Sequence, residues 1–147
     1  MGEVLTSLPA PPEHHLALAK PARGADTGGI YRAYDERRTK STTSAAPVVA
    51  ALRSGDLAAL AGAVGNDLEP VTKEFVPEVE MYGKDLLGAG ALGIAMTGTG
   101  TAVYGIFGTQ EQADSAVARL EAPFVGVYRP STRGVEALRD RRFARKL

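Results

Sequence analysis

Residues 97–101 read Thr-Gly-Thr-Gly-Thr, and this glycine loop is the stretch best suited to chemistry. Glycine lets a backbone turn sharply and lets a ligand approach without a Cβ atom in the way. Successive N–H groups in such a turn can form a nest that binds an anion. The composition therefore suits a phosphate or carboxylate ligand, although spacing alone favours an ordinary hairpin turn.

Two common phosphate motifs do not fit the glycine loop. A Walker loop ends in Gly-Lys-Ser/Thr, and no lysine follows Gly100. A dinucleotide fingerprint needs a third glycine where Val103 stands, and then a helix. The apolar run at residues 102–107 predicts a strand instead, so we expect the loop to join two strands.

Composition argues against several other kinds of site. The chain has 147 residues and no cysteine, which excludes disulfides, thiolate catalysis and cysteine-ligated zinc. His14 and His15 are the two histidines, and adjacent strand residues point to opposite faces, so we expect no metal site. Lys+Arg and Asp+Glu number 17 each, a balance that argues against a nucleic-acid binder.

No apolar run approaches the length of a membrane span, and the first residues lack the pattern of a signal peptide. We therefore expect no membrane partner and a cytoplasmic location. Hydrophobic residues make up 44% and charged residues 23% of the chain, as in one ordinary globular domain.

Short apolar runs bounded by glycine and proline predict four strands, at residues 16–20, 92–96, 102–107 and 124–128. Apolar residues at helical spacing predict helices at residues 27–34, 47–52, 56–64, 70–75, 77–87 and 110–120. Asp56 and Thr109 are the expected N-caps of two of these helices, and Pro70 is expected in a first turn.

This order of elements matches the ferredoxin-like β-α-β-β-α-β plan, with the first helix expanded into several. The predicted fold class is α+β, with a four-stranded antiparallel sheet and helices packed on one face.

Two stretches leave alternatives open. Residues 35–44 are polar and include Arg37, Arg38 and Lys40, which indicates a solvated connector or, less simply, a basic patch beside a phosphate. Tyr31 and Tyr34 lie one helical turn apart, and the residues alone favour rings packed on the sheet.

Four stretches, in this order, resemble the C-terminal domain of the GHMP kinases. They are Lys20-Pro21 with Thr27-x-x-Ile30-Tyr31, then Asn66-Asp67-Leu68-Glu69-Pro70, then Met96-Thr97-Gly98-Thr99-Gly100, and finally Phe124-Val125-Gly126-Val127. The glycine loop alone is weakly specific, and the Asn-Asp-x-Glu-Pro stretch before it makes the combination more specific. The resemblance covers residues 1–130.

The resemblance is greatest to family members that act on 4-diphosphocytidyl-2-C-methyl-D-erythritol in the non-mevalonate pathway to isoprenoids. It implies phosphoryl transfer from MgATP to the 2-hydroxyl group of that substrate, a reaction in which the protein mainly positions groups and stabilises charge.

Residue by residue, the resemblance implies a substrate-binding site. Tyr31 matches an aromatic residue that stacks on the cytosine ring, and Thr27 matches a polar residue near that ring. Gly98, Thr99 and Gly100 match a motif whose backbone lies beside the substrate. The sequence departs from the family at Gly28 and Gly29, where helix formers are usual.

Asn66, Asp67 and Glu69 match a family stretch to which the resemblance gives no chemistry. Capping of the helix that follows is the simplest role for short polar side chains at such a position.

The resemblance also implies a division of the chain. Residues 1–15 would be an inter-lobe lead-in, residues 16–130 the C-terminal domain, and residues 131–147 a basic helix or tail. The family's N-terminal lobe, with its ATP-binding loop and catalytic Lys and Asp, is not matched. We therefore expect no catalytic residue here, ATP and Mg²⁺ bound only by a complete kinase, and no turnover by this chain alone.

Two alternatives remain. In the first, the chain would be a stand-alone substrate-binding or regulatory lobe, or a lobe that pairs with a separately encoded N-terminal lobe. Alternatively it belongs to another GHMP kinase, of the mevalonate or homoserine type. The stretch from Thr27 to Tyr31 argues against the second alternative, because a residue that stacks on cytosine has no use there.

Overall fold

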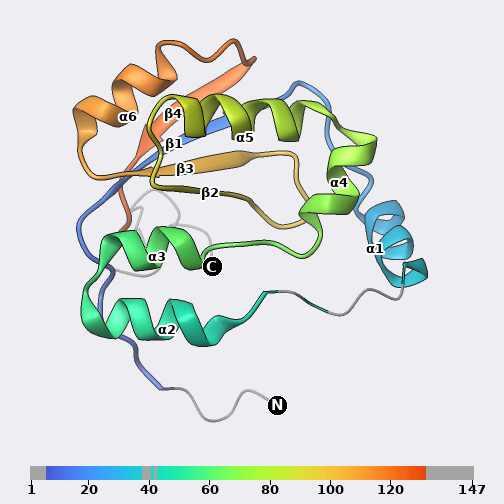
Figure 1. Ribbon diagram of the computed structural model, residues 1–147. Coiled ribbons are helices and arrows are strands. Elements are labelled where there is room, and N and C mark those ends of the chain that lie inside the picture. Colours follow the sequence, from blue (N-terminus) through green and yellow to red (C-terminus); the bar gives the residue numbers. More distant parts are fainter. Residues whose placement is uncertain (1–5, 38–40, 42, 132–147) are drawn as a thin grey trace, which may run out of the picture.

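The computed structural model of the protein describes residues 6–37, 41 and 43–131. Its strands confirm the four that were predicted: β1 (His15–Lys20), β2 (Gly93–Met96), β3 (Val103–Phe107) and β4 (Phe124–Tyr128). They form an antiparallel sheet in the order β2-β3-β1-β4 (Figure 1). This order is that of the ferredoxin-like plan, and the α+β fold class is confirmed.

The helices of the described part are α1 (Thr27–Glu36), α2 (Ala45–Ser54), α3 (Leu57–Ala63), α4 (Glu69–Phe75), α5 (Glu78–Gly88) and α6 (Gln110–Val117). The predicted caps are confirmed: Asp56 accepts a hydrogen bond from Ala59 N at 3.0 Å, and Thr109 forms a capping box with Gln112. Pro70 lies in the first turn of α4. Helix α6 ends three residues earlier than its apolar spacing predicted.

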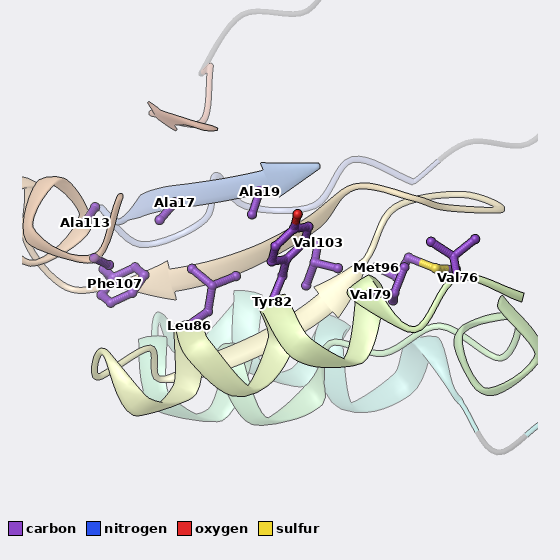
Figure 2. Close-up of a cluster of buried hydrophobic side chains, with 11 residues drawn as sticks. Ala17, Ala19, Val76, Val79, Tyr82, Leu86, Met96, Val103, Phe107 and Ala113 are labelled. Carbon is purple, nitrogen blue, oxygen red and sulfur yellow. The ribbon is translucent and has the colours of Figure 1, made fainter. Parts of the chain in front are cut away.

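The main core lies between the sheet and helix α5, with α6 beside it. Ala17 and Ala19 of β1 are fully buried, and their small side chains leave room for larger ones from the helix. Figure 2 shows Tyr82 and Leu86 of α5 directed at the strands. Burying a large apolar side chain contributes about 1.5–3 kcal/mol, so this cluster holds the helical layer on the sheet.

Helices pack on both faces of the sheet, whereas the sequence predicted helices on one face only. Figure 1 shows α2 and α3 on the side opposite α5 and α6, and α3 contacts β2. A Cβ atom built on Gly93 would lie 2.0 Å from the carbonyl oxygen of Ala61, so the backbones of β2 and α3 approach closely here. Glycine is the residue that permits such an approach.

The strand register brings the segments predicted to bind the substrate to one end of the sheet. Ala19 pairs with Val103, and Val103 pairs with Met96, so β1 and β2 end where β3 begins. Lys20 pairs with Phe124, which places the start of β4 at the same end. The chain leaves β1 here toward α1, and it leaves β2 here into the glycine loop.

Several predictions fall outside the described residues. These concern the lead-in at residues 1–5, Arg38 and Lys40 of the basic patch, and residues 132–147 of the C-terminal helix or tail. Within the described part, no helix is both long and apolar enough to cross a membrane.

Candidate functional site

The glycine loop joins β2 to β3 as a tight, exposed turn. Thr97 N donates to Ala102 O at 2.9 Å, and Gly100 N donates to Thr97 O at 2.9 Å. Gly98 and Gly100 have φ angles of 54° and 96°, in the left-handed region that favours glycine. A Cβ atom on Gly100 would also lie 2.8 Å from the Thr72 side chain. Both glycines are therefore required by the backbone path.

One side of the glycine loop is bound by the segment that leads into α4. Asn66 Nδ2 donates to Met96 O at 2.9 Å and to Gly98 O at 2.8 Å. Glu69 Oε2 accepts from Met96 N at 3.1 Å. Thr72 Oγ1, which is fully buried, donates to Thr99 O at 3.1 Å. The loop is thus fixed through its backbone by three side chains.

The other side of the glycine loop touches α1 and the segment before it. The hydroxyl groups of Thr27 and Thr99 lie 3.1 Å apart and share a hydrogen bond. Thr101 Oγ1 donates to Arg23 O at 3.0 Å. Thr27, the first residue of α1, therefore meets the loop directly.

Tyr31 lies one helical turn after Thr27 and so shares its helix face. The residue is 51% exposed, so it is not packed in the core. The structure thus brings Thr27 against the residues predicted in the glycine loop, and it leaves the ring of Tyr31 open to solvent nearby. Helix α1 forms in spite of Gly28 and Gly29, although Asp26 at its N-cap makes no side-chain capping bond.

Three basic residues around this surface are paired with carboxylates. Lys73 Nζ lies 2.6 Å from Glu69 Oε1, and Arg23 Nη2 lies 2.9 Å from Glu78 Oε2. Arg37 pairs with Glu74, so the described member of the suggested basic patch is engaged by a carboxylate. The described residues contain no group of three or more His, Asp or Glu side chains that could hold a metal ion.

A family model described as "GHMP kinases C terminal" matches residues 48–126, which is more than half of the chain. The chain belongs to this family. The matched range contains Asn66, Glu69, Thr72 and the glycine loop, so the contacts of these three side chains with the loop lie within it, whereas Thr27 and Tyr31 precede it.

Named relatives and solved structures agree with this assignment. A 4-diphosphocytidyl-2-C-methyl-D-erythritol kinase of Pelotomaculum thermopropionicum is 40% identical over 118 residues, covering 80% of this chain and 41% of that protein. The chain spans less than half the length of the curated relatives that it matches.

Two solved structures share the fold of this GHMP kinase C-terminal domain. A crystal structure of 4-(cytidine 5'-diphospho)-2C-methyl-D-erythritol kinase superimposes with a TM-score of 0.62 at 23% identity, covering 80% of this chain and 42% of that chain. L. major mevalonate kinase in complex with R-mevalonate gives a TM-score of 0.67 at 18% identity, covering 87% of this chain and 46% of that chain.

Sequence reasoning missed the part that Asn66 and Glu69 play at the glycine loop. The capping interpretation is wrong for Glu69, because the N-cap of α4 is Leu68, and the Glu69 side chain accepts from Met96 N instead. Asn66 does accept from Leu68 N at 2.9 Å, but both of its donated bonds go to the loop. The available signal was that the Asn-Asp-x-Glu-Pro stretch and the glycine loop occur together, which indicates contact between these two motifs.

Proposed function

We propose that this domain is the substrate-side lobe of a kinase acting on 4-diphosphocytidyl-2-C-methyl-D-erythritol. The observation that supports it is the hydrogen bond between Thr27 and Thr99, 3.1 Å long, which joins the helix of Tyr31 to the glycine loop. One extended nucleotide diphosphate can then touch an exposed aromatic ring and the backbone of the glycine loop together. The relatives at 33–40% identity bear the name of this kinase.

In this proposal each predicted residue has a separate role. The ring of Tyr31 stacks on the cytosine, an interaction worth about 1–3 kcal/mol. Thr27 contacts the cytidine end, and the backbone of Gly98, Thr99 and Gly100 lies along the diphosphate. The phosphoryl donor, MgATP, and the base that activates the 2-hydroxyl group are assigned to the part of the relatives that this chain does not span.

The test is an activity assay of the purified chain with MgATP and the diphosphocytidyl substrate. We expect no phosphorylation by the chain alone, because none of its residues is assigned to the donor or to the base. We expect activity when the N-terminal part of the Pelotomaculum thermopropionicum relative is added. Turnover by the chain alone would overturn the assignment of a half-kinase.

A binding or regulatory lobe is the second candidate, because every role that we assign to residues of this chain is in substrate binding and none is in catalysis. Substrate binding with no activity after any N-terminal part is added would support it. Failure to bind the diphosphocytidyl substrate would overturn both candidates and would leave another GHMP kinase as the better assignment.

A further inference from the structure

The carbonyl oxygens of Met96 and of the first three residues of the glycine loop are engaged within the protein. Those of Met96 and Gly98 accept from Asn66, and that of Thr99 accepts from Thr72. The carbonyl of Thr97 accepts from Gly100 N. Four consecutive carbonyl groups, from residue 96 to residue 99, are therefore bonded to the protein rather than offered to a ligand.

The N–H groups of the loop are distributed differently. Those of Thr97 and Gly100 are used inside the turn. Within the described part of the chain, the N–H groups of Gly98 and Thr99 donate to no other group. Gly98 is exposed and Thr99 is half-buried, so a ligand can reach this stretch. Between Met96 and Thr99 this described stretch therefore presents two free N–H donors, while its carbonyl oxygens are engaged, as an anionic oxygen requires.

Asn66 contributes most directly to this arrangement of engaged carbonyl groups and accessible N–H groups. Its two donated bonds bind the carbonyls on either side of Thr97, which fixes two peptide planes at once. Its own Oδ1 accepts from Leu68 N, so the carboxamide is held at both ends. Glu69 adds a bond to Met96 N, and Lys73 holds the other oxygen of that carboxylate.

We propose that Asn66 is a positioning residue for the substrate's diphosphate group, acting through the glycine loop with the help of Thr72. By binding the loop carbonyls it keeps the N–H groups of Gly98 and Thr99 directed at the ligand. The inference rests on the proposed function for the identity of the ligand. Whether Asn66 holds the loop in place does not depend on the ligand, and it can be tested without one.

The decisive variant is Asn66→Asp, which keeps the shape of the side chain and replaces its donor group by an acceptor facing two carbonyls. The matched control is Asp67→Asn, next along the chain. Asp67 accepts from Thr43 N at 3.1 Å and from Ser41, on the connector before α2, and none of these bonds reaches the loop. Both variants change one side chain of the same segment between carboxylate and carboxamide.

The first measurement is amide hydrogen exchange of the whole chain without ligand. In Asn66→Asp we expect exchange at Met96, Thr97 and Gly100 to become about tenfold faster or more, because the bonds that hold the turn are weakened. Asp67→Asn should leave these three amides unchanged. Unchanged exchange in Asn66→Asp, or equal acceleration in both variants, would overturn the holding role.

The second measurement is NMR titration of the same proteins with cytidine 5'-diphosphate and with cytidine. Asn66→Asp should weaken cytidine 5'-diphosphate binding about tenfold and change cytidine binding less than about twofold, because cytidine lacks the anionic oxygens. Tyr31→Ala should weaken both ligands. A parallel loss for both ligands in Asn66→Asp would mean general damage and would overturn the positioning role.

Failure of the proposed function gives a different result. If the wild-type domain binds neither cytidine 5'-diphosphate nor the diphosphocytidyl substrate, the function and the substrate part of this inference are overturned. The exchange measurement still decides whether Asn66 holds the loop.

Discussion

Tyr31 is 51% exposed, although large aromatic residues usually contribute to a core. Because the ring is not packed, removing it costs little folding energy. We expect Tyr31→Ala to leave the melting temperature nearly unchanged and to weaken binding of the diphosphocytidyl substrate by about 1–3 kcal/mol, or roughly 5- to 150-fold.

Tyr31→Phe is the control, since stacking uses the ring and not the hydroxyl group. It should bind the substrate as the wild type does. Calorimetric titration for binding and thermal unfolding for stability check both variants. A lower melting temperature with unchanged affinity in Tyr31→Ala would show that the ring serves packing only.

For individual residues, sequence reasoning placed Thr27 and Gly98 to Gly100 in one site, and the structure brings Thr27 and Thr99 into contact. It did not anticipate the role of Asn66. The reason is physical: Asn66 binds backbone carbonyls, and every residue type has such a carbonyl, so the partner's identity carries no signal. A contact between two side chains constrains the identity of both residues. A bond from a side chain to the backbone constrains only the residue that contributes the side chain.

Among the secondary-structure elements, the contact of β2 with α3 depends on Gly93. A methyl group there would meet a backbone carbonyl at 2.0 Å, which no side-chain rotation relieves. We expect Gly93→Ala to destabilise the domain by about 1–3 kcal/mol or more, as overpacking does. The free energy of unfolding in denaturant measures this loss.

Gly62 in α3 provides the matched control, because a Cβ atom there would meet nothing within 4 Å. Gly62→Ala should stabilise the domain by up to about 1 kcal/mol through helix propensity. Equal effects of the two substitutions would contradict the close approach of β2 and α3.

Helix α5 carries a pH-dependent contribution at its N-terminus. A hydrogen bond to its own backbone N–H group lowers the pKa of Glu78 from the ordinary value of 4.5, burial opposes this, and Arg23 lowers the pKa further. Because the pKa is lower in the folded state, this contribution is present above pH 4.5 and is lost as the pH falls through the folded pKa.

The melting temperature should therefore decrease on acidification below pH 4.5. In Glu78→Gln this decrease should be smaller, since the variant has no carboxylate to protonate at that position. Thermal unfolding followed at several pH values compares the two proteins. The same decrease in both would mean that Glu78 makes no such contribution.

Strands were well predicted because each is an apolar run with a glycine or proline at its border, as at Pro21 after β1 and Pro130 after β4. The end of α6 was placed too late at Leu120, since this residue keeps the helical spacing and packs against the core from beyond the helix. Periodicity shows which face of a helix is apolar. It does not show on which side of the sheet the helix lies. For α3, the side is the one on which the missing Cβ atom of Gly93 lets the helix backbone approach β2.

For the molecule as a whole, the order β2-β3-β1-β4 places β1 and β3 inside the sheet and leaves β2 and β4 at its edges. Amides in β1 and β3 open only when the sheet itself separates. We expect their hydrogen exchange to be at least about tenfold slower than that of β4, measured by NMR. Equally slow exchange in β4 would indicate that its outer edge is paired.

The pairing of Leu16 with Tyr128 places the strand by which the chain enters the sheet beside the strand by which it leaves, at the end away from the glycine loop. A domain with adjacent entry and exit strands tolerates circular permutation and transfer between host proteins. The points at which other chain segments would be attached are therefore remote from the surface that we propose binds the substrate. We expect a permutant opened at the exposed Gly55, with β4 linked to β1, to keep the Thr27–Thr99 contact and ligand affinity; loss of binding in a folded permutant would contradict this independence.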